Sequence, residues 1–492
     1  MTGATGSERG SGIQVGLPAP RRAPAAATAK ESAMTQRFDA IIIGTGQSGP
    51  PLAARLSGAG MSVAIIERAR FGGTCVNTGC IPTKTLIASA YAARLAQRAD
   101  EYGVVIGGPV TVDMKRVKAR KDEISGRSSR GVEQWLRGLE RCAVYHGHAR
   151  FEGAHAVRVD DTLLEAERIF INVGGRALVP PMPGLDQVPY LTNAGMMEVD
   201  FLPAHLIVVG GSYVGLEFGQ MYRRFGARVT IVEKGPRLIQ REDEDVSQAV
   251  REILENEGID VQLGADCLSV RRDADHVIVG LDCAGGAREV AGSHLLLAVG
   301  RVPNTDDLGL DRAGIETDAR GYIRVDEQLR TNVPGIWALG DCNGRGAFTH
   351  TSYNDYEIVA ANLLDHDARK VSDRITAYAM FIDPPLGRAG MTLTEAAQSG
   401  RRLLVGTRPM TRVGRAVEKG ESQGFMKVIV DADSGAILGA TILGVTGDEV
   451  IHTLLDIMYA KAPYTTISRA MHIHPTVSEL VPTLLQDLHP PE

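Results

Sequence analysis

The chain has 492 residues, of which 44% are hydrophobic and 23% charged, and its formal net charge is −6. At about 100–200 residues per domain, this length predicts roughly three domains, each able to bury a core. The acidic balance argues against nucleic acid as a partner, and no run of about 18 apolar residues predicts a membrane-spanning helix. We therefore expect neither nucleic acid nor a membrane among the partners.

Two features bear on where the protein works. Residues 1–36 are rich in Gly, Ala, Pro, Ser and Thr and lack the roughly 7–15-residue apolar segment of a signal peptide. They predict a disordered extension, with a targeting tail as the alternative, and Met34 is a second candidate start. Six cysteines in so long a chain do not form a secreted disulfide framework, so a cytoplasmic location is expected.

The first ordered unit predicted from the sequence begins at Phe38. FDAIIIG is a continuous apolar run of buried-strand length, and it leads into the turn Gly44-Thr45-Gly46-Gln47-Ser48-Gly49. PLAARLSGAG then predicts a helix, and MSVAIIE predicts a second strand that ends in Glu67, 18 residues after Gly49. These segments together predict a strand, helix and strand joined by a glycine-rich turn.

The same pattern recurs in HLIVVGGSYVGLEFGQMYRRFGARVTIVE. Gly210, Ser212 and Gly215 occupy the three turn positions, and Glu233 again follows 18 residues after the last of them. Beyond about residue 370 there is no third such turn, and GFMKVIVDADSGAILGATILG reads as alternating strands. We predict an α/β protein with two Rossmann-like dinucleotide-binding domains and a C-terminal α+β domain.

Each turn residue has a physical reason to bind a dinucleotide. Gly44 permits the tight turn, Gly46 lets backbone N–H groups approach a pyrophosphate, and Gly49 lets the helix pack on the strand. Glu67 would hold a ribose hydroxyl. Ser212 replaces the middle glycine of the second turn and should crowd a pyrophosphate only slightly.

Two cysteines directly follow the first unit. Cys75 and Cys80 can form a disulfide only if the chain bends, and Gly79 supplies that freedom. A thiolate at Cys80, near a helix start and one turn before Lys84, would have a lowered pKa. The pair is therefore suited to reversible two-electron exchange, with two buried thiols or half a metal site as alternatives. No second CxxC or histidine cluster completes a zinc set, so no metal site is predicted, and the remaining cysteines are interpreted as ordinary thiols: Cys142, Cys267, Cys283 and Cys342.

Over about residues 37–490, the sequence resembles the FAD-dependent pyridine nucleotide-disulfide oxidoreductases, the family of glutathione reductase, dihydrolipoamide dehydrogenase and mercuric reductase. Ala338-Leu339-Gly340-Asp341 resembles the second FAD motif, whose aspartate binds the ribityl chain. GRVPNT from Gly300 looks like the start of that half of the FAD domain. The resemblance implies FAD in the first site and NAD(P)H in the second, with Thr74 among the FAD contacts and Gly300 among the NAD(P)H contacts.

The resemblance also implies a domain arrangement and a homodimer. The FAD-binding domain would comprise residues 37–184 and 295–365, and the NAD(P)-binding domain residues 185–294. Residues 366–492 would form the dimerisation domain, with an active site shared between two subunits.

The family's catalytic roles map onto residues of this chain. Cys80 would be the thiol nearest the flavin, forming the charge-transfer thiolate, and Cys75 the interchange thiol that meets the substrate. Lys84 and Glu217 would form an ion pair beside the flavin, with a plain buried salt bridge as the alternative. Tyr213 matches the aromatic gate over the nicotinamide pocket, or is simply a packed tyrosine at a helix start.

A C-terminal motif completes the set. His472-Ile473-His474-Pro475-Thr476-Val477-Ser478-Glu479 looks like the family's HPTxSE motif. His474, supplied by the partner subunit, would take and return the thiol proton, and Glu479 would orient its imidazole. His472 is interpreted as structural.

Substrate and coenzyme are narrower hypotheses. Glu233 favours NADH over NADPH because a carboxylate repels a 2′-phosphate, although Lys234 and Arg237 lie nearby in sequence.

Mercuric reductases typically carry a C-terminal cysteine pair, whereas the last cysteine here is Cys342. FTHTSYNDYEIV and PPLGRAGMT look closest to the mercuric-reductase-like group that includes cupric reductases of reactive-chlorine resistance. We therefore expect NAD(P)H-driven reduction of a metal ion, Cu(II) or Hg(II), or of a small disulfide or oxidant. A dihydrolipoamide dehydrogenase is one alternative, and a flavin-bound redox sensor without turnover is another.

Overall fold

The structure is a computed structural model that describes residues 35–283 and 286–491. The predicted extension therefore lies almost entirely outside the described residues, as does Met34, and the side chains of Cys267 and Cys283 are not described either. The first strand begins at Thr35, two residues before the predicted boundary, because its first residues continue the pairing with a neighbouring strand.

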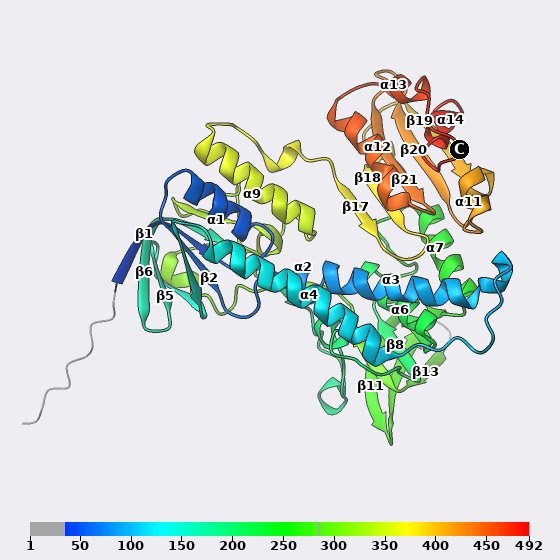
Figure 1. The fold of residues 1–492 in the computed structure, drawn as a ribbon, viewed down its shortest axis with the longest axis horizontal. Helices are drawn as coiled ribbons and strands as arrows, with labels where there is room; N and C mark the ends of the chain where they lie inside the picture. Colours follow the sequence, from blue (N-terminus) through cyan, green and yellow to red (C-terminus); the bar gives the residue numbers. More distant parts are fainter. Residues whose placement is uncertain (1–34, 284–285, 492) are drawn as a thin grey trace, which may run out of the picture.

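The first unit is built on a seven-stranded sheet in the order β3-β2-β1-β6-β5-β4, with β16 also paired to β6. Five of its strands are parallel: β1, β2, β3, β6 and β16. Parallel strands with continuous apolar runs need cover on both faces of the sheet. Helices α1, α4 and α9 pack around this sheet in Figure 1. The elements of this unit are β1 (Thr35–Ile43), α1 (Gly49–Gly58), β2 (Val63–Glu67), α2 (Gly73–Asn77), α3 (Cys80–Gln97), α4 (Met114–Arg137), β3 (Cys142–His146), β4 (Ala149–Gly153), β5 (Ala156–Val159), β6 (Thr162–Ile171), α8 (Leu310–Ala313), β16 (Ile336–Ala338) and α9 (Thr349–Leu364).

The second unit holds a four-stranded parallel sheet in the order β10-β9-β8-β14 beside an antiparallel sheet of β11, β12 and β13. Because β14 pairs with β8, this unit extends past the predicted boundary at residue 294. Its elements are α5 (Asn193–Met196), β8 (His205–Val209), α6 (Tyr213–Phe225), β9 (Arg228–Val232), α7 (Glu244–Asn256), β10 (Asp260–Gln262), β11 (Ala265–Asp273), β12 (His276–Cys283), β13 (Gly286–Gly292) and β14 (His294–Leu297).

The second unit is inserted into the first. The two chain crossings between them, β7 (Gly175–Ala177) and β15 (Arg301–Pro303), pair with each other as an antiparallel ribbon. The first unit is therefore discontinuous in sequence.

The third unit is an antiparallel sheet in the order β17-β18-β21-β20-β19, with α12 packed on it. The predicted alternating strands are its β20 and β21. Its elements are β17 (Ala377–Met380), β18 (Leu386–Gly390), α10 (Leu393–Gln398), β19 (Leu403–Pro409), α11 (Gly414–Glu418), β20 (Phe425–Asp431), β21 (Ile437–Leu443), α12 (Gly447–Tyr459), α13 (Thr465–Ser468) and α14 (Leu480–Leu484).

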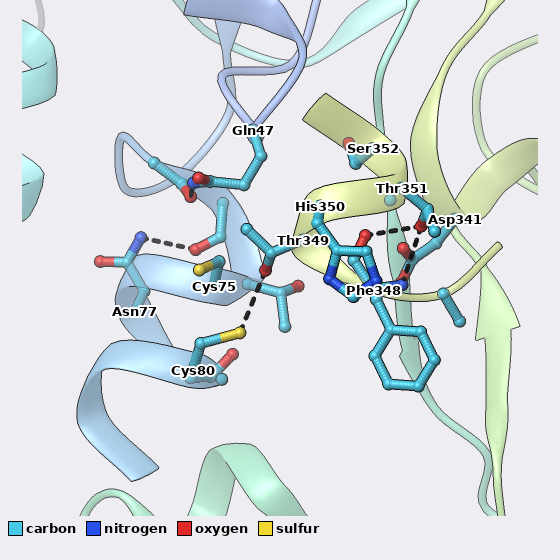
Figure 2. Close-up of a pocket in the computed structure, with 18 of the residues that line it drawn as sticks. Gln47, Cys75, Asn77, Cys80, Asp341, Phe348, Thr349, His350, Thr351 and Ser352 are labelled. Carbon is cyan, nitrogen blue, oxygen red and sulfur yellow. Dashed lines mark hydrogen bonds between the residues drawn. The ribbon is translucent and has the colours of Figure 1, made fainter. Parts of the chain in front are cut away.

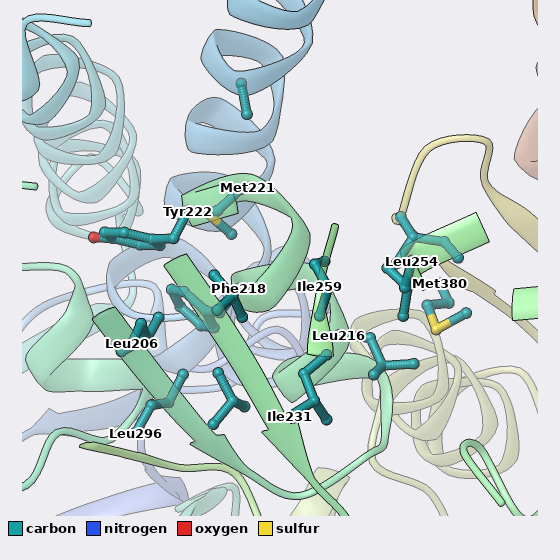
Figure 3. Close-up of a cluster of buried hydrophobic side chains, with 14 of the residues drawn as sticks. Leu206, Leu216, Phe218, Met221, Tyr222, Ile231, Leu254, Ile259, Leu296 and Met380 are labelled. Atoms are coloured by element: carbon teal, nitrogen blue, oxygen red, sulfur yellow. The ribbon is translucent and has the colours of Figure 1, made fainter. Parts of the chain in front are cut away.

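One apolar cluster joins the three units. It contains Leu86 on α3, the buried face of α6, and Met380 at the end of β17. Figure 3 shows Phe218 and Met221 of α6 between the strands of the second sheet and the neighbouring helices, with Met380 beside Leu254. The start of α3, which carries Cys80, is thereby held against the second unit. Within the described residues, no helix is long and apolar enough to cross a lipid bilayer.

Replacement of Phe170 tests the core of the first unit. Its side chain is 0% exposed and stacks on Trp337 with ring centroids 4.9 Å apart. Phe170→Ala should lower the free energy of unfolding by about 3–5 kcal/mol because it leaves a cavity. The measurement is urea unfolding followed by circular dichroism. Phe201→Ala, at a side chain that is 47% exposed, is the matched control and should cost about 0.5 kcal/mol. Equal losses for both variants would contradict this assignment of the core.

Candidate active site

A cavity of about 1180 Å³ lies where the three units meet. Its walls come from the first glycine-rich turn, the segment 72–84, the start of α6, residues 347–354 at the start of α9, residues 374–381, and one face of α12. A volume of this size accepts a dinucleotide cofactor.

The first turn has the shape that a pyrophosphate needs. A Cβ added to Gly44 would lie 2.2 Å from the carbonyl oxygen of Asn172, and one added to Gly46 would lie 2.9 Å from Asn172 Oδ1. A Cβ added to Gly49 would lie 2.3 Å from the carbonyl oxygen of Gly44. Only glycines fit these positions, and the turn from Gly44 to Gln47, directly before α1, lines the cavity with little side-chain bulk. The residues present therefore fit the FAD pyrophosphate.

Two acids line this part of the cavity. Glu67, at the end of β2, accepts hydrogen bonds from the backbone N–H of Thr45 at 3.1 Å and from its hydroxyl at 2.6 Å, which ties the strand to the turn. Asp341 follows β16 and lies 3.3 Å from the Arg301 guanidinium. Burial raises the pKa of the Asp341 carboxyl, against the opposing charge of Arg301. The predicted FAD contact Thr74 lies in the same wall.

The second turn repeats the geometry of the first. A Cβ added to Gly215 would lie 2.1 Å from the carbonyl oxygen of Gly210, so this helix also packs tightly on its strand. Ser212 precedes the first residue of α6, and Glu233 accepts a hydrogen bond from the backbone N–H of Gly211 at 2.6 Å. These residues lie outside the cavity lining, as a separate nucleotide-binding edge would.

Two other predicted nucleotide contacts lie near this edge. Tyr213, the first residue of α6, lines the cavity, and its ring centroid is 5.6 Å from that of Phe348. Gly300 follows β14, whose end lies next to the second turn because β14 pairs with β8. The structure therefore places both residues beside the second turn.

The cysteine segment folds back on itself between α2 and α3. Cys75 lies in α2 and Cys80 is the first residue of α3. A Cβ at Gly79 would lie 2.8 Å from the carbonyl oxygen of Thr74, so only glycine permits the close approach of the two helices. Asn77 Nδ2 closes the segment by donating to two backbone carbonyls. Figure 2 shows both sulfur atoms beside the start of α9.

The two thiols are electrostatically unequal. A hydrogen bond from Cys75 lowers the pKa of the Cys80 thiol to about 6, with smaller contributions from Thr349 and Lys84. The same hydrogen bond and burial raise the pKa of the Cys75 thiol well above its usual range. Negative charge is therefore favoured on Cys80 over Cys75, and Cys75 needs a base before it can react.

The predicted ion pair is present. Lys84 Nζ lies 2.7 Å from Glu217 Oε2, and the Glu217 side chain is only 4% exposed. Glu217 also accepts the backbone N–H of Phe381 at 2.9 Å, and Lys84 Nζ lies 4.4 Å from the centre of the Phe381 ring. The pair therefore joins α3, α6 and the third unit at the floor of the cavity.

Three site residues were not predicted. The Thr349 hydroxyl lies 3.1 Å from Cys80 Sγ, and the rings of Phe348 and Tyr378 stack beside it. Thr349 and Phe348 belong to FTHTSYNDYEIV, which resembles the mercuric-reductase-like group but gave no reason to single out either residue. A single threonine has no spacing pattern that would have identified it.

The C-terminal pair forms, but away from the thiols of its own chain. His474 Nδ1 lies 2.9 Å from Glu479 Oε2, and the His474 side chain is 81% exposed. Neither residue lines the cavity of the same chain. His472 Nδ1 bonds the carbonyl oxygen of Ser478 at 2.9 Å, which fits its structural interpretation.

The remaining described thiols lie outside the cavity. Burial raises the pKa of Cys142 to about 11 and that of Cys342 to about 12. In the described part of the chain, no three His, Cys, Asp or Glu side chains are grouped so as to hold a metal ion.

Comparison with known proteins identifies the family. Residues 38–355 match the family model described as pyridine nucleotide-disulphide oxidoreductase, and residues 376–485 match the dimerisation domain of that family. The chain belongs to the pyridine nucleotide-disulphide oxidoreductases. This oxidoreductase family implies FAD and a pyridine nucleotide, and the matched dimerisation domain supports a homodimer. The predicted fold class is confirmed.

Individual relatives of this oxidoreductase carry several names. The chain is 36% identical to a probable pyridine nucleotide-disulfide oxidoreductase, RclA, of Escherichia coli, over 90% of this chain and 97% of the relative. It is 32% identical to a mercuric reductase of Streptomyces lividans, over 90% and 94%. It is 31% identical to a dihydrolipoyl dehydrogenase of Thermus scotoductus, over 92% and 97%.

A solved structure is similar throughout. The Cu(II) complex of the HOCl-induced flavoprotein disulfide reductase RclA from Escherichia coli superposes with a TM-score of 0.84 at 34% identity. The match covers 92% of this chain and 99% of that one. The cofactor-binding and C-terminal units of this oxidoreductase are therefore arranged as in a flavoprotein disulfide reductase.

The ion pair can be tested by charge removal on either side. Lys84→Gln removes a cation that stabilises the thiolate and should raise the pKa of Cys80 above 6, whereas Glu217→Gln should lower it. The measurement is the pH dependence of iodoacetamide alkylation of Cys80 in the reduced protein, which falls as pH drops through the pKa. Arg251→Gln, in the surface pair with Glu255, is the control and should change nothing. Shifts of the same sign in both variants would refute the electrostatic account.

Proposed function

We propose that this enzyme is an NADH-dependent flavoprotein reductase that uses Cys75 and Cys80 to reduce a metal ion, Cu(II) or Hg(II), or a small disulfide or oxidant. The observation that carries the proposal is the unequal thiol pair facing a cavity with a dinucleotide-binding turn. FAD, when bound, supplies the two-electron carrier between the pyridine nucleotide and the thiol pair.

Different side chains stabilise the charge on Cys80 and accept the proton of Cys75. Lys84 and the Thr349 hydroxyl stabilise negative charge on Cys80, so this sulfur stays ionised. Cys75 keeps its proton and must lose it to become a nucleophile or a metal ligand. We propose that Nε2 of His474 from a second copy accepts this proton, because its Nδ1 is engaged by Glu479.

The electrons balance for either class of acceptor. Oxidation of the Cys75 thiol and the Cys80 thiolate to a disulfide releases two electrons and one proton. A disulfide acceptor takes up the two electrons, this proton and one more from solvent to give two thiols. Two Cu(II) ions take up only the two electrons to give two Cu(I) ions, and the proton passes through the base to solvent. One NADH, which gives up a hydride, then restores the Cys75 thiol and the Cys80 thiolate. Thiolate sulfur suits copper and mercury because soft ligands bind soft ions.

The relatives favour copper as the metal substrate. The similar solved structure is a Cu(II) complex, and its chain is matched over nearly its full length. Mercury has less support, since the mercuric reductase of Streptomyces lividans is 32% identical to this chain against 36% for RclA. We also propose a reducing compartment such as the cytoplasm, because a working dithiol must not be trapped as a disulfide.

A dihydrolipoamide dehydrogenase is the second candidate. Dihydrolipoyl dehydrogenases from several organisms are 31–34% identical to this chain, and the His474 and Glu479 pair suits dithiol exchange. The sensor alternative is less favoured because an enzyme-type proton shuttle serves turnover.

Substitution at the cysteines tests the proposed function. Cys80→Ser should keep bound FAD and lose acceptor-dependent NADH oxidation, because the thiolate is removed while the glycine-rich turn is intact. The assay is anaerobic NADH oxidation with Cu(II), Hg(II), lipoamide and glutathione disulfide in turn. Cys142→Ser, at a thiol outside the cavity, is the control and should retain full activity. Turnover of Cys80→Ser equal to that of the unchanged enzyme would exclude the thiol route, and fast turnover with lipoamide alone would favour the second candidate.

The proposed base, His474 of the second copy, can be tested by removing its imidazole. His474→Ala should lose about 10²–10⁴-fold in dithiol exchange, since its base is gone. Single-turnover reduction of lipoamide or glutathione disulfide by the prereduced enzyme measures this step alone. An unchanged rate would remove His474 from the proton path, and Arg469→Ala on the same segment controls for local unfolding.

Coenzyme choice has its own test. Glu233→Gln keeps a hydrogen-bond acceptor and removes the charge that repels a 2′-phosphate. The ratio of kcat/KM for NADPH to that for NADH should rise about tenfold. Glu244→Gln, at an exposed acid of the same unit, should leave the ratio unchanged. A ratio that stays constant in Glu233→Gln would mean that another group selects the coenzyme.

A further inference from the structure

A row of polar side chains crosses four strands of the third unit. Tyr378 on β17 is in register with Arg388 on β18, which is in register with Thr441 on β21 and then Lys427 on β20. The last three side chains are buried. Buried charges are costly unless they are paired, and the acids that pair with this row belong to the second unit.

Glu242 of the second unit is the partner at one end. It precedes α7 and is buried. Arg388 Nε lies 3.1 Å from Glu242 Oε2, and the Tyr378 hydroxyl donates to Oε1 of the same carboxylate. Burial and the neighbouring carboxylate both raise the pKa of Tyr378, so its hydroxyl keeps the proton that makes this bond. Tyr378 is thereby anchored across the boundary between two units.

Lys427 is held by other acids at the other end of the row, one of which, Asp243, also lies 3.7 Å from the Arg388 guanidinium. Its Nζ lies 3.0 Å from Asp243 Oδ2 and 2.8 Å from Asp245 Oδ1. Neither acid contacts Tyr378. This end therefore joins the same two units without touching the cavity, and it offers a matched control.

The tyrosine ring continues the contact toward the thiols. It stacks on Phe348 with centroids 5.5 Å apart and an interplanar angle of 6°, and His350 stacks on Phe348 at 5.4 Å and 9°. Phe348 is followed directly by Thr349, whose hydroxyl lies 3.1 Å from Cys80 Sγ. Figure 2 shows Phe348, Thr349 and Cys80 in this order along the wall of the cavity.

We infer that Tyr378 is a positioning residue for Thr349. Anchored to Glu242 of the second unit, its ring holds Phe348, and Phe348 fixes the first turn of α9. The Thr349 hydroxyl is then aimed at the Cys80 sulfur. This inference rests on the proposed role of Cys80 as the reactive thiolate.

The groups that face Cys80 define what can be measured. Cys75 faces it from α2, Lys84 from its own helix, Glu217 from α6 and Thr349 from α9. The first three are held by contacts that do not include Tyr378. A change at Tyr378 should therefore reach the sulfur only through Thr349.

A double-mutant cycle tests this route without relying on turnover. The readout is the rate of iodoacetamide alkylation of Cys80 in the reduced holoenzyme at pH 6, measured by mass spectrometry across a pH series. Thr349→Val removes the hydroxyl at nearly constant shape and should slow alkylation about tenfold. Tyr378→Phe removes only the anchor and should slow it about threefold. The double variant should match Thr349→Val alone, because a residue that acts through Thr349 adds nothing once that hydroxyl is gone.

The control is Lys427→Met, which breaks the other end of the row. It should lower the melting temperature and leave the alkylation profile unchanged. If Tyr378→Phe likewise changes only the melting temperature, or if the two effects multiply in the double variant, the inference is wrong. An unchanged protein whose Cys80 titrates near the ordinary thiol value would instead contradict the proposed function, so the two failures are distinguishable.

Discussion

The ion pair between Lys84 and Glu217 determines how the rest of the site is assembled. It lies one turn inside two helices whose first residues, Cys80 and Tyr213, face the same cavity. A carboxylate this deeply buried is unfavourable without partners, and its second oxygen is satisfied by the backbone N–H of Phe381. One charged contact thus sets the distance between the thiol, the aromatic side chain and the third unit. The Lys84 cation held by this assembly makes a smaller contribution to the lowered pKa of Cys80, after the hydrogen bonds from Cys75 and Thr349.

The elements found from the sequence share a local origin. Both glycine-rich turns depend on residues within about six positions of each other, and backbone carbonyls leave no room for a Cβ at Gly49 or Gly215. The unit boundaries were less accurate because they depend on pairing between distant segments. Thr35 is ordered through β6, and β14 joins the second sheet through β8, which precedes it by the whole of that unit. No local pattern in the residues around position 294 indicates that partner.

The candidate site likewise contains residues that the sequence predicted and residues that it did not. The cysteine pair was found because its spacing has a chemical meaning, and resemblance supplied Lys84 and Glu217, which the structure brings into contact. Thr349 and Tyr378 were missed because their importance arises from a ring stack and from a carboxylate in another unit. Such residues are recognisable only when the neighbouring surfaces are known. Sequence reasoning therefore finds reactive groups more readily than the groups that hold them in place.

The insertion of the second unit into the first also has a consequence for biosynthesis. The half of β6 that contains Phe170 is completed by β16, which is translated only after residues 172–335. At about 5–20 residues per second, a ribosome needs on the order of 10–30 s to make that stretch. During this interval an apolar strand edge of the first sheet is open, and unpaired edges invite association with other chains. The far wall of the cavity, from Asp341 to Ser352, follows later still. The second unit must therefore emerge before the first can close, so this edge of β6 stays open through the middle of translation.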